Sequence, residues 1–235
     1  MKYKRILLKL SGESLMGKEQ FGYSKETVTQ IVAEIKKLHE LGLEIAIVVG
    51  GGNLCRGKNL NGHGVDPATA DYMGMMATIM NGLYLQDVLK FAGIENRVMT
   101  AIGVNEVAEP FIRLKALKHL GKKRIVILSA GTGNPFSTTD TASSLKAKEL
   151  NCDLIIKATK VDGIYDKDPN KFEDAVKYEH LTFKTAIEKN LEVMDTTAFT
   201  MCQDFNIPII VCNVMGVNNL TSIVMGEKIG TLVTN

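Results

Sequence analysis

One run of residues indicates the fold class most directly, namely Glu44-Ile45-Ala46-Ile47-Val48-Val49-Gly50-Gly51-Gly52-Asn53. Its first six residues form an almost continuous apolar run, which is typical of a strand buried on both faces of a parallel sheet. The three glycines that follow end the strand in a turn whose backbone a bound anion can approach closely. The stretch therefore predicts an α/β protein with an anion-binding turn at the carboxyl end of a strand.

The same alternation of apolar strands and amphipathic helices continues in both directions from this stretch. Further strands are predicted at 5–10, 97–102, 124–128, 153–158, 207–212 and 231–233. Helices are predicted at 24–41, 68–92, 110–120, 140–150, 182–189, 195–205 and 218–225. This order predicts a mostly parallel sheet covered by helices on both faces. Because no linker, repeat or low-complexity segment interrupts it, we expect a single domain over residues 1–235.

The composition narrows the class of protein. Hydrophobic residues make up 45% of the 235 residues and charged residues 23%, which is typical of a globular chain. The net charge of +2 and the absence of a basic run argue against a nucleic-acid partner. Neither a Cys-x-x-Cys pair, a secretory signal nor a long apolar span is found, so we expect a cytoplasmic protein with reduced thiols and no membrane partner.

Three glycine-rich turns follow predicted strands, at Lys9–Gly12, Gly50–Asn53 and Gly131–Asn134. In an open parallel sheet, ligands bind at the carboxyl ends of the strands, where backbone N–H groups and helix N-termini bind anions. The P-loop pattern, a complete Gly-x-Gly-x-x-Gly and the Gly-x-Ser-x-Gly elbow are all missing from the sequence. The turns therefore predict a phosphate or nucleotide site of another kind.

Four charged residues near these turns are candidates for the chemistry, each with a structural alternative. Lys9 ends an apolar strand, where a lysine is costly unless it meets an anion; the alternative is an edge lysine that reaches solvent. Arg56 lies four residues after Gly52 and could bind a phosphate with its fork, or be a solvated loop residue. Asp140 and Asp71 lie near helix starts, where capping and the helix dipole also favour Asp.

Two further groups have a structural interpretation first. Three aspartates, Asp162, Asp166 and Asp168, fall in a turn-rich segment and lack the calcium-loop spacing, so turn roles are the default. The methionines of the long predicted helix indicate core or a subunit interface; they are Met73, Met75, Met76 and Met80.

At this level of detail the chain resembles the amino-acid kinase family. The motifs that carry the resemblance are Ile6–Glu13, Gly50–Asn53 with Arg56, and Asp71–Met75. Others are similar to the uridylate kinase branch of that family, namely Ser129–Phe136, Thr138–Asp140, Lys157–Gly163 and Val224–Lys228. Together these motifs extend over essentially the whole chain.

The resemblance implies a three-layer α/β/α sandwich, a homohexamer, and Mg²⁺-dependent transfer of the ATP γ-phosphoryl group to UMP in pyrimidine nucleotide biosynthesis. ATP would be bound by Lys9, Leu10, Ser11, Gly12, Gly52, Arg56, Thr159, Tyr165 and Asp168. UMP would be bound by Gly51, Arg56, Asp71, Thr132, Gly133, Asn134, Pro135, Phe136, Ser137, Thr138 and Thr139. The catalytic group would be Lys9, Arg56, Asp140 and Lys160, and no protein side chain would bind the metal.

The resemblance also implies regulation by nucleotides. GTP activation in the family involves a glycine-rich segment that aligns with Gly17, Lys18, Glu19, Gln20, Phe21 and Gly22. Gln20 replaces a glycine that many members have, so GTP activation is less expected here than inhibition by UTP.

The chemistry of such a reaction agrees with these residues. A phosphate acceptor with a second pKa near ~6 is largely dianionic at neutral pH and needs no general base. Bringing two anions together is the difficulty, since unit charges ~4 Å apart repel by roughly 4 kcal/mol at an effective dielectric of about 20. Lys9, Arg56, Lys160 and Mg²⁺ would offset this repulsion, and we expect Asp140 to orient a lysine.

Two alternatives remain at the level of sequence. One is another amino-acid kinase, acting on carbamate or an amino-acid carboxylate, against which Asp71 and the stretch 132–139 argue. The other is a nucleotide sensor that keeps the fold without turnover, against which Lys9, Arg56 and Asp140 argue.

Overall fold

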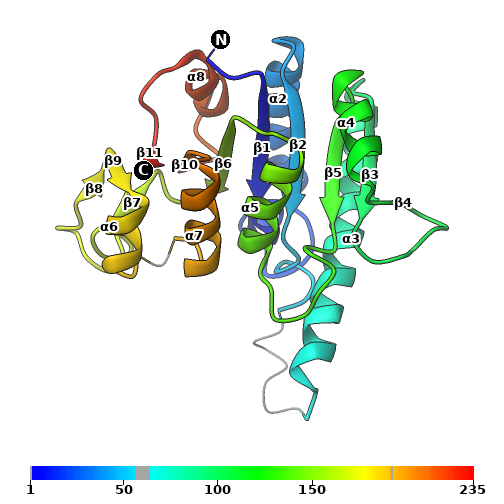
Figure 1. Cartoon of the computed structure of the whole chain (residues 1–235), viewed down its shortest axis with the longest axis horizontal. Coiled ribbons are helices and arrows are strands. Elements are labelled where there is room, and N and C mark those ends of the chain that lie inside the picture. The colour runs from blue at the N-terminus through cyan, green and yellow to red at the C-terminus, as the bar shows by residue number, and fades with distance from the viewer. Residues whose placement is uncertain (1, 57–63, 192) are drawn as a thin grey trace.

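The computed structural model describes residues 2–56, 64–191 and 193–235 and is built around a nine-stranded sheet (Figure 1). Its strand order is β4-β3-β5-β2-β1-β6-β10-β11-β9, and β7 and β8 form a separate hairpin. The strands are β1 Arg5–Leu10, β2 Glu44–Val49, β3 Asn96–Thr100, β4 Glu109–Pro110, β5 Ile125–Ser129, β6 Leu154–Thr159, β7 Ile164–Tyr165, β8 Lys177–Tyr178, β9 His180–Thr182, β10 Ile209–Asn213 and β11 Thr231–Thr234. All neighbours in the large sheet are parallel except β10 and β11.

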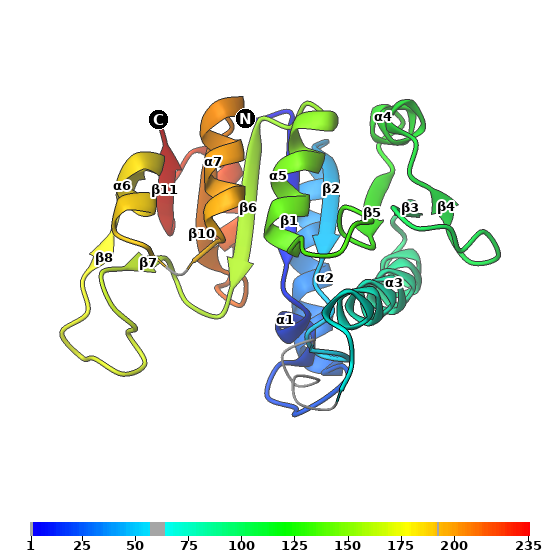
Figure 2. The ribbon, with the colours of Figure 1, turned by 60° about the horizontal axis from the view of Figure 1, so that its bottom comes forward.

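Helices cover both faces of this sheet and complete three layers (Figure 2). They are α1 Gly12–Met16, α2 Lys25–Glu40, α3 Pro67–Phe91, α4 Arg113–Gly121, α5 Thr139–Glu149, α6 Phe183–Glu188, α7 Thr196–Phe205 and α8 Asn219–Met225. One core contains residues of α2, α3 and α8, and the other contains residues of α4, α5, α6 and α7. The strand β1 supplies Ile6 and Leu8 to the first core and Leu7 to the second, as the alternation of side chains along a strand requires.

The predicted α/β/α architecture is confirmed, with one local error. Pro110 does not open a helix, because it pairs with Thr100 in the edge strand β4, and α4 begins only at Arg113. An edge strand tolerates proline since the missing N–H would face away from the sheet. The short helix α1, the hairpin β7–β8 and the edge strand β9 were not predicted, and their few residues give no clear periodicity. In the part of the chain that the structure describes, no helix combines the length and apolar character needed to span a membrane.

Candidate active site

The three glycine-rich turns lie at the carboxyl ends of β1, β2 and β5, which are neighbours in the sheet. The first two turns touch, since a Cβ on Gly12 would lie only 2.6 Å from the backbone nitrogen of Gly52. The second turn packs against α3, where a Cβ on Gly51 would lie 2.8 Å from the carbonyl oxygen of Gly74. Glycine is therefore required by close backbone approach at both positions.

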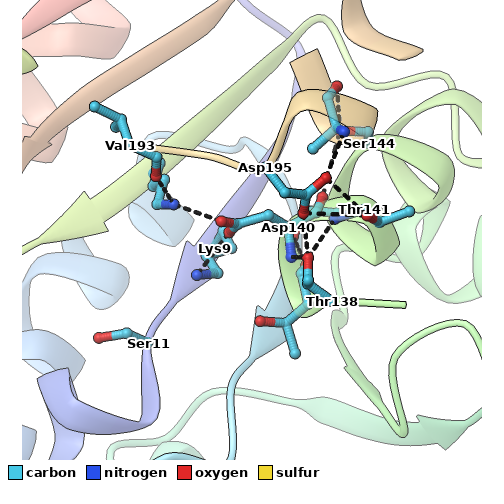
Figure 3. Close-up of polar contacts among 12 residues, drawn as sticks. Lys9, Ser11, Thr138, Asp140, Thr141, Ser144, Val193 and Asp195 are labelled. Atoms are coloured by element: carbon cyan, nitrogen blue, oxygen red, sulfur yellow. Dashed lines mark hydrogen bonds and ion pairs between the residues drawn. The ribbon is translucent and has the colours of Figure 1, made fainter. Parts of the chain in front are cut away.

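A buried cluster of two lysines and one aspartate lies beside these turns (Figure 3). The Asp140 carboxylate forms ion pairs of 2.7 Å with Lys9 through Oδ1 and with Lys157 through Oδ2. Lys9 and Lys157 are partners in the parallel pairing of β1 with β6, so the sheet register sets the two ammonium groups side by side. Two cations on one anion leave the cluster with a net positive charge in a buried site.

The cluster shifts the protonation equilibria of its members. Burial alone would raise the pKa of Asp140, but the charges of Lys9 and Lys157 outweigh it and hold that pKa below its usual value. Burial and the charge of Lys9 lower the pKa of Lys157 to about 8, although Asp140 acts in the opposite direction. Asp140 is therefore ionised at neutral pH and pairs with both lysines.

A second aspartate holds the start of α5 on which Asp140 lies (Figure 3). The Asp195 carboxylate accepts hydrogen bonds from the hydroxyls of Thr138 and Thr141, and it caps α7 through the Ala198 N–H at 2.8 Å. The carbonyl of the nearby Val193 accepts a hydrogen bond from Lys157. The segment before α7 is thus tied to the cluster at Lys157 and to the start of α5 at Thr138 and Thr141.

A cavity of about 140 Å³ lies between the second and third glycine turns and includes Thr139, the residue before Asp140, in its lining. Its lining includes five of the residues predicted to bind the acceptor, which are Gly51, Asp71, Thr132, Ser137 and Thr139. Asp71 comes from α3, and its Oδ2 atom accepts the backbone N–H of Phe136 at 2.7 Å. The structure therefore brings residues of the second turn, helix α3 and the third turn together around one small cavity.

The outer part of the third turn does not line this cavity. Phe136 has a φ of +63° and its side chain is 79% exposed, and Asn134 donates its backbone N–H to the Thr132 hydroxyl at 3.2 Å. Gly133 has a φ of +82° and packs on the Ala101 carbonyl. The cavity lining therefore does not include Gly133, Asn134, Pro135 and Phe136, which were predicted to bind the acceptor.

Arg56 links the first two turns. Its Nη2 atom lies 2.7 Å from Glu13 Oε1, and its Nε atom donates to the Gly52 carbonyl at 3.1 Å. Both charged side chains are 45% exposed. A half-exposed ion pair of this kind contributes ~1 kcal/mol or less, so an incoming phosphate can displace Glu13.

Asp140 lines one of two larger cavities, and these two cavities share Asn190, Leu191 and Val193. One, of about 510 Å³, is lined by Asp140 and Asp195, and the other, of about 450 Å³, by Tyr165 and Asp168. The Tyr165 hydroxyl donates to Asp162 at 2.5 Å, and this hydrogen bond raises the pKa of the tyrosine. Tyr165 and Asp168, both predicted to lie on the adenosine side, thus line the same cavity.

Thr159, Lys160 and Ser11 have other partners in this structure. The Thr159 hydroxyl donates to the Val161 carbonyl at 2.7 Å, and Ser11 caps α1 through the Ser14 N–H at 3.0 Å. Lys160 donates to the Gly17 carbonyl at 3.1 Å and does not pair with Asp140. Lys160 therefore contacts the segment 17–22, and the second cation on Asp140 is Lys157.

The segment 17–22 is attached to the second glycine turn. The Gly22 N–H donates to the Asn53 carbonyl at 3.0 Å, and the Asn53 side chain donates back to the Gly22 carbonyl at 2.9 Å. The segment 17–22, which the resemblance links to GTP, thus contacts the second glycine turn through Asn53.

Comparison with known proteins shows to which family the chain belongs. Residues 4–213 match the amino acid kinase family. The chain belongs to that family. A UMP kinase from Bacillus anthracis is 39% identical, with a TM-score of 0.96, and the match covers 100% of this chain and 97% of that one. A UMP kinase from Ureaplasma parvum is 34% identical, with a TM-score of 0.93 and complete coverage of both chains. A uridylate kinase from Archaeoglobus fulgidus is 27% identical, with a TM-score of 0.76, covering 97% of this chain and 99% of that one.

Two site residues of this amino acid kinase were missed in the sequence. Lys157 carried a usable signal, because it interrupts the apolar strand Leu154–Thr159 in the way that Lys9 interrupts its own strand. The only sequence signal at Asp195 is that of a residue at a helix start. Its hydrogen bonds to Thr138 and Thr141 could not be predicted, because they join positions more than 50 residues apart.

Proposed function

We propose that this amino acid kinase transfers the γ-phosphoryl group of ATP to UMP, giving UDP for pyrimidine nucleotide biosynthesis. The observation that supports this function most is the buried Lys9–Asp140–Lys157 cluster, which carries a net positive charge beside the glycine turns. Thr139 lines the small cavity and its neighbour Asp140 lines the 510 Å³ cavity, so the two sides meet at one peptide bond. The full-length similarity to UMP kinases supports UMP as the acceptor.

The proposed chemistry needs charge stabilisation and no general base. The acceptor phosphate is already a nucleophile at neutral pH, because its second pKa is near ~6. Lys9 and Lys157 would stabilise the charge on the transferred phosphoryl group, and Asp140 would hold both ammonium groups in place. Asp140 would not accept a proton, since two bound cations keep its pKa low.

The substrates would divide between the two sides of the cluster. ATP phosphates would bind at Lys9–Gly12 and Gly52, with Tyr165 and Asp168 on the adenosine side together with Thr159. UMP would bind in the 140 Å³ cavity, with Asp71 at the ribose hydroxyls and Gly51 and the stretch 132–139 around the base and phosphate. Arg56 would exchange Glu13 for phosphate, and Lys160 would approach the donor from the segment 17–22.

Mg²⁺ would bridge the ATP phosphates. Within the described ranges, no three His, Cys, Asp or Glu side chains come together as a metal site, and both oxygens of Asp140 face lysines. The ion would therefore be held by phosphate oxygens and water, which suits the coordination that Mg²⁺ prefers.

We also propose how the protein assembles and how nucleotides regulate it. Helix α3 exposes an apolar stripe of Tyr72, Met73, Met76 and Met80, and we assign this stripe to subunit contacts in a homohexamer. UTP inhibition and GTP action through residues 17–22 belong to the same proposal, as do a single domain and a cytoplasmic location.

A coupled assay with an acceptor panel tests the proposed function. ATP and Mg²⁺ would be offered with UMP, CMP, carbamate and amino-acid carboxylates, with GTP and UTP as effectors. Rapid formation of UDP from UMP supports the proposal. Turnover of a carboxylate without UMP would place the chain in another branch of its family, and calorimetric binding of ATP and UMP without product would indicate a sensor.

A further inference from the structure

Through one face, helix α3 contacts the second and third glycine turns, which flank the 140 Å³ cavity proposed for UMP, here called the acceptor cavity. Asp71, Thr78 and Asn81 lie on successive parts of this face, and each forms a hydrogen bond to a different point of the loops around the cavity. In Figure 1 the helix, drawn in cyan, extends past the edge of the sheet where β2 and β5 end. A rigid helix in this position can set the separation of the second and third glycine turns.

Thr78 holds the third turn. Its buried hydroxyl accepts the Ala130 N–H at 2.7 Å and donates to the Met75 carbonyl of its own helix at 2.7 Å. Ala130 is fully buried and has a φ of +63°, a left-handed conformation that non-glycine residues rarely adopt. Without the Thr78 oxygen, the Ala130 N–H would be buried without a partner, and the strained turn would lose the contact that holds it.

Asn81 holds the second turn. Its side-chain nitrogen donates to the Gly50 carbonyl at 2.6 Å and to Asn53 Oδ1 at 2.7 Å, and Asn53 Nδ2 donates back to Asn81 Oδ1 at 3.2 Å. Both amides are buried. This reciprocal pair satisfies its own polar atoms, and Asn53 extends it to Gly22.

We propose that Thr78 and Asn81 are positioning residues that hold the third and second glycine turns at the separation the acceptor needs. The proposal rests on the proposed function, because it names the site of the acceptor. Thr78 lines the cavity, but its hydroxyl is already engaged by two backbone groups. Its effect on the acceptor is therefore exerted through Ala130, and Asn81 acts through Gly50.

The first test is Thr78→Val, which keeps the shape and removes the hydroxyl. Loss of one buried hydrogen bond should speed amide exchange at Ala130 by about tenfold or more in the free protein, and raise KM for UMP by a similar factor. KM for ATP should stay within about twofold, since the donor side is not touched. Thr78→Ser restores the hydroxyl and should return both values toward wild type.

A matched control is Thr231→Val. The Thr231 hydroxyl is also buried, accepts a backbone N–H from Ile164 at 2.8 Å and donates to the Tyr178 carbonyl. This variant should speed exchange at Ile164 and leave KM for UMP unchanged. Equal effects of the two valine variants on KM for UMP would overturn the proposal, because they would report a general loss of stability.

The variant Asn81→Ala tests the proposal independently of Thr78. It should speed amide exchange in Gly51–Asn53, leave Ala130 unchanged, and raise KM for UMP. Wild-type exchange and KM in both Thr78→Val and Asn81→Ala would refute the positioning role. Amide exchange is measured in the free protein and needs no turnover. Faster amide exchange in variants of a protein that does not use UMP would therefore refute the proposed function but leave the positioning role intact.

Discussion

Lys9 and Lys157 are register partners on adjacent parallel strands, and their ammonium groups bind opposite oxygens of the Asp140 carboxylate. Two like charges are thus held together by the sheet and compensated by one anion from the start of α5. The remaining positive charge is available to a phosphoryl group, which favours transfer between two anionic nucleotides.

The pH dependence of the reaction should report Lys157. Burial and the charge of Lys9 lower the pKa of Lys157 to about 8, and the protonated ammonium is the form that stabilises phosphoryl charge. We therefore expect kcat/KM to fall as the pH rises through about 8, since this ratio reports the free enzyme. Lys157→Arg stays protonated and should lack this decline, whatever its maximal rate. A wild-type profile that stays flat to about pH 10 would contradict the assignment.

Asp140→Asn should impair both stability and rate. Removing the carboxylate leaves two buried ammonium groups without a counter-ion, so the free energy of unfolding should fall by about 3–5 kcal/mol. The pKa of Lys157 should drop further, because Asp140 raises it in the wild type. Urea unfolding measures the first effect, and a shift of the alkaline limb of kcat/KM to lower pH measures the second. An unchanged limb would show that Lys157 does not limit the rate.

Arg56→Ala should weaken UMP use far more than ATP use, because Arg56 would bind the acceptor phosphate. A charge-assisted fork contributes about 1.5–3 kcal/mol, so KM for UMP should rise by roughly 10- to 150-fold. Glu13→Gln is the control, since it removes the group that occupies Arg56 and should lower KM for UMP by up to about fivefold. Equal losses for both nucleotides in Arg56→Ala would remove its role as the acceptor clamp.

Lys9→Ala and Lys160→Ala should separate transfer from donor binding. Lys9 lies in the buried cluster, so its loss should lower kcat by at least about a hundredfold. Lys160 is partnered with the Gly17 carbonyl, and its loss should mainly raise KM for ATP. Single-turnover rates at saturating ATP distinguish the two effects. A normal transfer rate in Lys9→Ala would exclude it from the mechanism.

Much of the fold and the meeting of the glycine turns follow from local sequence, whereas the assignment of residues to donor and acceptor came from the resemblance to the amino-acid kinase family. Apolar strands such as Glu44–Val49 and the rule that parallel sheets bind ligands at their carboxyl ends predicted which turns meet. Lys157 carried a local signal as a lysine inside an apolar strand, but its position beside Lys9 depends on the pairing of β6 with β1, which no local pattern encodes. Thr78 and Asn81 look like ordinary helix residues until the two turns that they bind are placed against α3.

The neighbouring positions of Thr139 and Asp140 have a consequence for inhibitor design. These residues line the proposed acceptor cavity and the 510 Å³ cavity respectively, so the two cavities meet at consecutive residues, whose Cα atoms are ~3.8 Å apart. A single molecule in which a short polyphosphate bridge joins two nucleosides could span this junction and occupy both cavities. Such a bisubstrate compound would gain affinity because binding of its second nucleoside is intramolecular. The bridge length that gives the tightest binding would measure the distance across which the phosphoryl group moves.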